Sequence, residues 1–175
     1  MKQNILSPAL LLASVILITL SCQKEVSNQE QLEEEIATTI GTANNPTFNL
    51  EVILRGEDGR LGHVKFRQDV NPSKIVVLGT WVRGLEPDHQ YLLQRAVDAA
   101  NVVDGNCTST SWLTLGKGLT PQSILTDDGG KGSEELWRDL SAVASGTAFD
   151  IHFRILDAAT MAVVLTSDCY QYVVR

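Results

Sequence analysis

The sequence predicts an all-β fold, an antiparallel Greek-key sandwich or barrel of seven or eight strands with one disulfide. Three observations support this prediction. From Thr47 onward, most segments alternate apolar and polar residues with a period of two, clusters of Gly, Asp and Pro separate these segments, and no stretch has the pattern of a long helix. Short strands joined by such turns are typical of antiparallel sandwiches and barrels.

The first predicted hairpin shows the alternation most clearly. TFNLEVILR, residues 47–55, and LGHVKFRQ, residues 61–68, are joined through GEDG, which is a hairpin turn signal. His63, Lys65 and Arg67 are expected to face outward. The residues expected to face the core are Phe48, Leu50, Val52, Leu54, Val64 and Phe66.

Five or six further strands are expected along the rest of the chain. The predicted segments are KIVVLGTWVRG (74–84), YLLQRAV (91–97), TSWLTLG (110–116), part of QSILTDDGG (122–130) or of ELWRDLSAV (135–143), TAFDIHFRIL (147–156) and MAVVLTSDCYQYVV (161–174). In TAFDIHFRIL the alternation places Asp150, His152 and Arg154 on the outer face.

The start of the chain predicts export. Lys2 precedes an apolar run over residues 10–20, which is shorter than the roughly 20 residues of a membrane span, and Cys22 follows. This layout resembles a bacterial lipoprotein signal peptide of residues 1–21. The resemblance implies that Cys22 is lipidated and anchors the protein in the bacterial cell envelope, at the outer membrane, facing either the periplasm or the surface. An ordinary cleaved signal with a spare cysteine is the alternative.

The charge distribution separates a tether from a domain. Residues 22–46 contain five Glu and one Lys and are expected to be a mostly disordered acidic tether, whereas 47–175 form the β domain. The chain has 14 Lys and Arg against 21 Asp and Glu, a net charge of −7. This balance argues against a nucleic-acid partner, and leaves the membrane, through the lipid anchor, and a protein or glycan as the expected partners.

The cysteines predict a stabilised, oxidised domain. Once Cys22 is assigned to lipid, Cys107 and Cys169 remain. In an exported chain these two are expected to pair, and two unpaired buried thiols are the alternative.

Several segments together resemble the copper/zinc superoxide dismutases. NLEVILRGEDGRLGHVKFRQ is similar to the opening hairpin of that family, GTWVRGLEP to its third strand and Gly-Leu turn, NCTSTS to its Cys-Thr-Ser segment, and TSDCYQYVV to its last strand. The resemblance covers most of 48–109 and 146–175. It implies the Greek-key β fold and a disulfide between Cys107 and Cys169.

The metal ligands of that family are largely missing. The family holds copper and zinc mainly through histidines, and the His-x-His of its fourth strand falls at about Leu93 and Arg95 here. Only His152 matches a copper-ligand position. We therefore expect no dismutase activity and no cofactor, with His152, alone or with His63 or His89, as the candidate metal ligand.

A second resemblance concerns the segment GLEPDHQY. Leu85, Pro87 and Tyr91 have the spacing of the tyrosine corner of fibronectin type III and related sandwiches. In that family the tyrosine hydroxyl hydrogen-bonds back across the turn, and both resemblances imply an antiparallel β fold.

The function expected from the sequence is that of a binding or structural module without catalysis. No recognisable set of catalytic residues is present, and Trp81, Trp112 and Trp137 are the candidate binding residues. The alternatives are a weak copper-binding or metal-handling envelope protein, and an enzyme whose site lies in residues 110–145.

Overall fold

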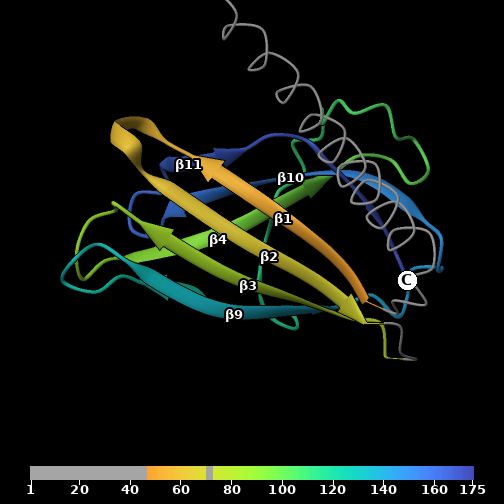
Figure 1. Cartoon of the computed structure of the whole chain (residues 1–175), viewed down its shortest axis with the longest axis horizontal. Helices are drawn as coiled ribbons and strands as arrows, with labels where there is room; N and C mark the ends of the chain where they lie inside the picture. The colour runs from red at the N-terminus through yellow and green to blue at the C-terminus, as the bar shows by residue number, and fades with distance from the viewer. Residues whose placement is uncertain (1–46, 70–72) are drawn as a thin grey trace, which may run out of the picture. The chain divides into compact units, whose positions relative to one another are not determined.

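The fold is a single sheet that curls into a nearly closed barrel (Figure 1). A computed structural model describes residues 47–69 and 73–175, so the predicted signal peptide, Cys22 and the tether lie outside the described residues. Within the described part, no helix is long and apolar enough to cross a membrane. The strands are β1 (Thr47–Arg55), β2 (Leu61–Asp69), β3 (Ile75–Arg83), β4 (Gln90–Val97), β5 (Leu113–Thr114), β6 (Gly116–Lys117), β7 (Thr120–Pro121), β8 (Ser123–Leu125), β9 (Gly132–Asp139), β10 (Ala148–Asp157), β11 (Val163–Ser167) and β12 (Tyr170–Val173), with a 3-10 turn η1 (Glu57–Gly59).

The order of the strands explains how the barrel closes. The sheet runs β5-β4-β10-β11-β1-β2-β3-β9-β6-β7, with β12 beside β10 and β8 beside β4. The end strand β5, on β4, and the next-to-last strand β6, on β9, belong to one continuous piece of chain, Leu113 to Lys117. All pairings are antiparallel except the single parallel contact between β6 and β9. The predicted all-β, antiparallel fold is therefore confirmed.

The number of strands is higher than the seven or eight predicted. The expected strand over 110–116 is divided at Leu115 into β5 and β6, and the expected last strand is divided at Asp168 and Cys169 into β11 and β12. Both QSILTDDGG and ELWRDLSAV contribute a strand, β8 and β9. The first division occurs because the chain changes its pairing partner, from β4 for β5 to β9 for β6. In the second, β11 and β12 both pair with β10, and the ladder is interrupted between them, where the register shifts by one residue. The polar–apolar pattern itself records neither event.

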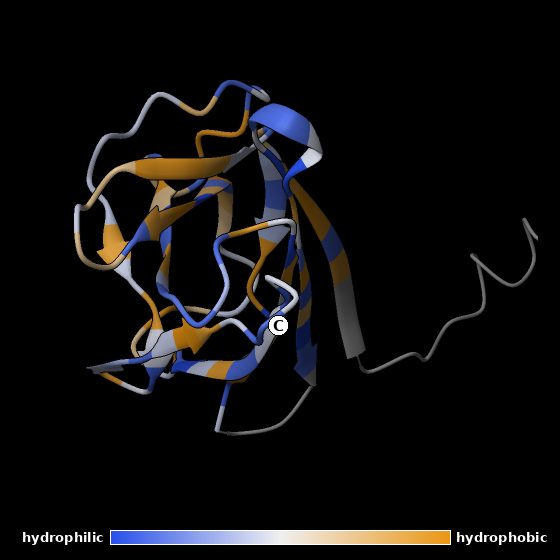
Figure 2. Ribbon diagram, turned by 90° about the vertical axis from the view of Figure 1, so that its left-hand side faces the viewer, coloured by the Kyte–Doolittle hydropathy of each residue, from blue (hydrophilic) through white to orange (hydrophobic). Residues whose placement is uncertain are grey.

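The core lies in the interior, between the two sides of the barrel. Hydrophobic and hydrophilic residues alternate along the strands that enclose it (Figure 2). In β1 and β2, Val52 lies opposite Val64 and both are fully buried, as the alternation predicts. From the other side, Leu93 of β4 lies opposite Ile155 of β10, and both are also fully buried. At about 25 cal/mol per Å² of apolar surface removed from water, this burial is the main source of stability.

The turn between β3 and β4 is tied down by the tyrosine predicted to do so. The buried Tyr91 hydroxyl accepts a hydrogen bond from the Glu86 backbone N–H at 3.0 Å. Thr126, which is buried, donates its hydroxyl to the Glu86 carbonyl and accepts from the backbone N–H of His89. The turn is thus joined to the β8–β9 hairpin, where the Leu85 N–H donates to the Gly130 carbonyl.

A long loop, residues 98–112, is held on the outside of the barrel. Cys107 and Cys169 form the predicted disulfide, with 5.4 Å between their Cα atoms. Asp98 accepts hydrogen bonds from the backbone N–H groups of Thr108 and Ser109, which hold the pKa of its carboxyl below the ordinary value.

Asp150 lies on the outer face of β10, as the alternation predicts, but only 1 % of its surface is exposed. The loop covers it, and its carboxylate accepts hydrogen bonds from the backbone N–H groups of Asp104 and Gly105 at 2.8 and 2.9 Å. An outward position in a strand is therefore buried here by a distant loop.

Candidate ligand-binding site

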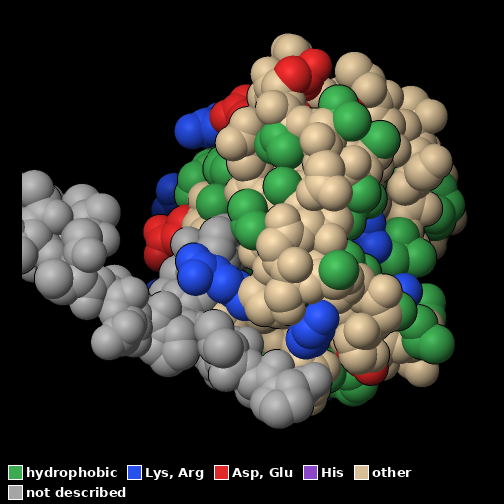
Figure 3. Space-filling model, turned by 90° about the vertical axis from the view of Figure 1, so that its right-hand side faces the viewer, with side chains coloured by type: hydrophobic (Ala, Val, Ile, Leu, Met, Phe, Trp, Pro, Cys, Tyr) green, Lys and Arg blue, Asp and Glu red, His purple; other side chains and the backbone are tan. Residues whose placement is uncertain are grey.

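A cavity of about 80 Å³ opens at one end of the barrel. This end, on the right in Figure 1, holds the C-terminus and the last residues of β4 and β9. Viewed from there, Lys and Arg side chains lie among hydrophobic ones (Figure 3). Among the described residues, ten apolar or aromatic ones and two arginines form the wall, and no acidic residue does: Phe66, Val76, Leu78, Arg95, Val97, Leu115, Arg138, Leu140, Val143, Phe149, Ile151 and Tyr172.

Arg95 is the most unusual residue of this wall. It lies in β4 between the inward-facing Leu93 and Val97, opposite the buried Phe153 of β10, so it points into the barrel. Within 47–69 and 73–175, no acceptor lies within hydrogen-bonding distance of its guanidinium. Burial, and secondarily repulsion from Arg138, lowers the pKa of Arg95. A desolvated cation of this kind costs stability unless an anion compensates it.

Arg138 enters the same cavity from the opposite side. On β9 the buried Leu136 and the half-buried Arg138 face inward, whereas Trp137 and Asp139 face outward. One guanidinium nitrogen of Arg138, Nη1, donates to the carbonyl of Gly118 at 3.1 Å. Asp139, the nearest acidic residue in sequence, accepts instead from the Ser141 N–H on the outer side. The positive charge facing the cavity therefore has no carboxylate beside it on the wall.

The rim adds a third cation. Lys74 donates from Nζ to the carbonyl of Val143 at 2.8 Å, and Val143 lines the cavity. The only other polar side chain of the wall, Tyr172, donates its hydroxyl to Gln68. In a chain whose net charge is −7, this end of the barrel combines an apolar cavity with convergent cations. Such a combination is typical of a small-molecule binding site.

The structure places the predicted metal ligand, His152, elsewhere. It lies on the outer face of β10 opposite Ala96, and its ring packs against Trp112 with 4.6 Å between the ring centroids. His152 Nε2 is 3.0 Å from the carbonyl oxygen of Ser109. Because a carbonyl only accepts, Nε2 carries the proton and is not available to a metal.

Leu93 and Arg95, the positions at which the dismutase resemblance would place copper-binding histidines, face away from His152. Leu93 and Arg95 point into the barrel, whereas the neighbours of His152 on the outer face of β4 are Gln94 and Ala96. Neither face of β4 therefore carries a histidine next to His152.

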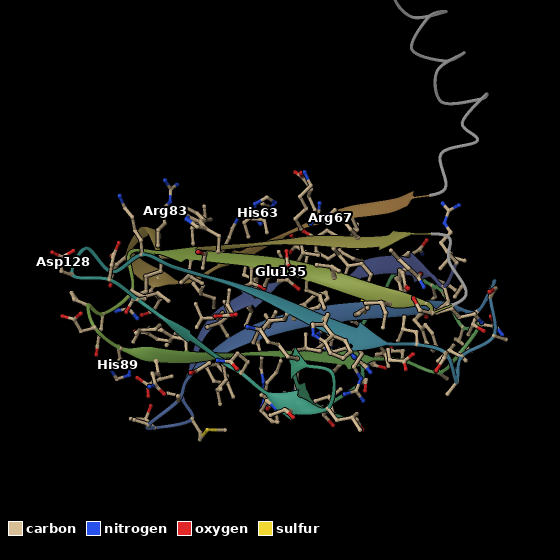
Figure 4. The ribbon with its side chains drawn as sticks, turned by 90° about the horizontal axis from the view of Figure 1, so that it is seen from below. His63, Arg67, Arg83, His89, Asp128 and Glu135 are labelled. Atoms are coloured by element: carbon tan, nitrogen blue, oxygen red, sulfur yellow. A yellow bond between two sulfur atoms is a disulfide. The ribbon has the colours of Figure 1, made fainter. Side chains whose placement is uncertain are left out.

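The three histidines do not come together. His63 lies on the outer face of β2, and His89 lies at the far end of the barrel (Figure 4). Ala96, the partner of His152, is seven residues beyond His89, which corresponds to about 24 Å along a strand at about 3.4 Å per residue. The structure thus offers no site that His152 shares with His63 or His89.

His89 instead belongs to a group that the sequence did not indicate. Its Nε2 lies 2.7 Å from Asp157, and Glu86 lies 4.0 Å from its Nδ1. Within the described ranges, this is the one group of three His, Cys, Asp or Glu residues close enough to hold a metal ion. Asp157 also accepts backbone hydrogen bonds from Ala159 and Thr160, and the Thr160 bond is the main cause of its lowered pKa. These contacts give the group a structural role in closing the β10–β11 turn.

The three candidate tryptophans occupy two surfaces. Trp81 and Trp137 share the outer face of β3 and β9, where Trp81 lies opposite Ser133 and Trp137 opposite Val77. Trp112 lies on the other side of the barrel, where the guanidinium carbon of Arg154 is 4.0 Å from its ring centroid. None of the three lines the cavity.

The residues that sequence reasoning missed are Arg95 and Arg138. A signal was present for Arg95, because the alternation in YLLQRAV places it on the same face as Tyr91, Leu93 and Val97. A cation on an otherwise apolar face of a strand is uncommon without a partner or a function. Arg138 had no such signal, since ELWRDLSAV does not show which face is buried.

Comparison with known proteins provides no further guide to the site. The chain matches none of the protein-family models, curated proteins or solved structures with which it was compared.

Proposed function

We propose that this protein is a non-catalytic, lipid-anchored protein of the bacterial cell envelope, whose β domain is a binding module for a small hydrophobic ligand. The observation that carries the proposal is the apolar cavity at the end of the barrel, with Arg95 directed into it. Packing alone gives no reason to keep a guanidinium there, because an apolar residue of similar length fills the same space without desolvating a charge.

The framework of the domain is, in this proposal, that of a superoxide dismutase that has lost its metal ligands. The Cys107–Cys169 disulfide, which the resemblance implies, supports it.

A protein or glycan partner on the outer face of β3 and β9 is the second candidate function. It is favoured by Trp81 and Trp137, which lie on the same face, four positions apart in register. At about 3.4 Å per residue, their separation along the strands is about 13 Å, a span that suits an extended partner.

The lipid anchor is tested by substituting the cysteine that would carry it. We expect Cys22→Ala to move the protein from the membrane fraction to the soluble fraction, because the variant lacks the acyl chains that hold it. The measurement is immunoblotting of both fractions after cell lysis. Ser27→Ala in the tether is the matched control and is expected to remain in the membrane fraction. Retention of Cys22→Ala in the membrane would contradict the anchor.

The binding module is tested with 1-hexanol and hexanoate as probes and the chain of residues 23–175, which lacks the lipid. We expect both probes to shift the amide NMR signals of the cavity residues in a saturable way, with dissociation constants of about 3 mM or below, at about 0.5 kcal/mol per heavy atom. Val143→Phe fills the cavity and is expected to abolish binding. Val163→Phe, the same change at an exposed position, should leave it unaffected. Binding that survives Val143→Phe would exclude the cavity as the site.

A further inference from the structure

Resting on the proposed function, we propose that the ligand of the barrel cavity is an amphipathic anion, a monocarboxylate with a short hydrocarbon chain. Its carboxylate lies between Arg95 and Arg138, and its chain fills the apolar part of the cavity. Three features of the site lead to this class of ligand: its cations, the composition of its wall, and its size.

The cations define the charge of the ligand. Two guanidinium groups line the same cavity, close enough for the charge of Arg138 to add to burial in lowering the pKa of Arg95. Two like charges in a desolvated place repel each other, and an anion between them converts that repulsion into two attractions. No Asp or Glu of the described residues lines the cavity and could serve as that anion.

The geometry of the donors favours a planar acid group. Guanidinium presents parallel N–H groups that match the two oxygens of a carboxylate, which makes such pairs charge-assisted and directional. One nitrogen of Arg138 already donates a hydrogen bond to the Gly118 carbonyl, which holds the side chain in place. Arg95 has its donors uncommitted within the described ranges, so it is the main binding group, and Arg138 completes the site.

The size of the cavity limits the hydrocarbon part. An apolar cavity of about 150 Å³ takes one benzene molecule, and the cavity here is about 80 Å³. A chain of a few carbon atoms therefore fits inside the cavity, the end of a six-carbon chain extends into its opening, and the two long chains of a membrane phospholipid do not fit. We accordingly assign the anion to a free carboxylic acid rather than to a lipid headgroup.

The first test compares hexanoate with 1-hexanol, two probes with the same six-carbon chain that differ in charge. We expect hexanoate to bind at least about tenfold more tightly, since hydrogen bonds to a charged group contribute about 1.5–3 kcal/mol. The Nε–Hε signals of Arg95 and Arg138 are expected to shift with hexanoate and to stay unchanged with hexanol. Equal affinity for the two probes would overturn the anion inference and leave the proposed function standing. Binding of neither probe would overturn both.

The second test removes the charge. Arg95→Met is expected to lower the affinity for hexanoate to that for hexanol, while hexanol still binds. Arg95→Lys is expected to keep part of the preference, because it retains the charge and loses the paired N–H groups. Arg83→Met, at an exposed position beside Trp81, is the control and is expected to leave both affinities unchanged. A preference for hexanoate that persists in Arg95→Met would contradict the assignment of Arg95.

A third test separates a free acid from a membrane lipid. Vesicles of phosphatidylcholine with phosphatidylglycerol are sedimented with the chain of residues 23–175. We expect no co-sedimentation that depends on Arg95. Co-sedimentation lost in Arg95→Met, together with equal affinities for hexanoate and hexanol, would move the assignment from a free acid to a lipid headgroup.

Discussion

Breaking the Cys107–Cys169 disulfide is expected to lower the free energy of unfolding by about 4 kcal/mol. The two cysteines are 62 residues apart in sequence, and closing a loop of that length restricts the unfolded chain by about that amount in the chain-entropy model. The bond also fixes the loop of residues 98–112 to the start of β12, where the hydrogen bonds of Asp98 and Asp150 alone would otherwise hold it. Urea unfolding of Cys107→Ser with Cys169→Ser measures the change.

The single variants provide the control for this prediction. Cys107→Ser and Cys169→Ser each break the same bond, so each is expected to lose nearly as much stability as the double variant. Reductant should destabilise the unmodified chain by a similar amount and leave the variants unchanged. A loss below about 1 kcal/mol would show that the loop is held mainly by its carboxylate contacts, since hydrogen bonds to charged groups are worth about 1.5–3 kcal/mol each.

Substituting Gly130 by alanine is expected to cost at least about 3 kcal/mol, which is at the high end for a single substitution. Gly130 has a positive φ of 68°, and a Cβ there would approach the backbone carbonyl oxygen of Leu85 far more closely than van der Waals contact allows. That carbonyl belongs to the turn that Tyr91 closes, and the Leu85 N–H donates to Gly130 itself. Neither backbone can move without breaking the connection between the β3–β4 turn and the β8–β9 hairpin.

Gly59→Ala separates the cost of a positive φ from the cost of the steric clash with Leu85. Gly59 also has a positive φ, 75°, but a Cβ there would have no neighbour within 4 Å. Its substitution is expected to cost only the backbone term of about 1 kcal/mol. The difference between the two variants in urea unfolding therefore measures the steric clash with Leu85. Equal losses of unfolding free energy in Gly59→Ala and Gly130→Ala would show that the β8–β9 hairpin shifts to accommodate the Cβ and that the two turns are not rigidly joined.

Local sequence patterns were sufficient to predict the strands of the hairpin and their burial. Val52, Leu54 and Val64 are fully buried where the period of two places them, because alternate side chains of a strand face opposite sides. The hydrogen bond of Tyr91 was expected from the resemblance of GLEPDHQY to a tyrosine corner, and its donor, the Glu86 N–H, lies only five residues away in the same turn. The partner of Cys107 followed from the small number of cysteines.

The sequence was less informative where one segment is buried by another that is distant in the chain. Asp150 occupies an outward position and is buried by a loop more than 40 residues away. The division of 110–116 into two strands depends on which neighbour each half meets, β4 or β9, and the division of 161–174 depends on an interruption of its pairing with β10. Pairing between distant segments is determined by the whole fold, and a one-residue change of register would reverse every face.

The candidate site likewise depends partly on local sequence and partly on contacts between distant segments. By itself the sequence determined the β fold and the lack of a histidine pair in YLLQRAV, because both depend on residue type and local spacing. It also determined the disulfide, because few cysteines were available to pair. Only the tertiary structure decided that Arg95 and Arg138 face one cavity and that His63, His89 and His152 lie apart. Arg95 and Arg138 are more than 40 residues apart in sequence, and closure of the barrel between β4 and β9 is what brings their charges together.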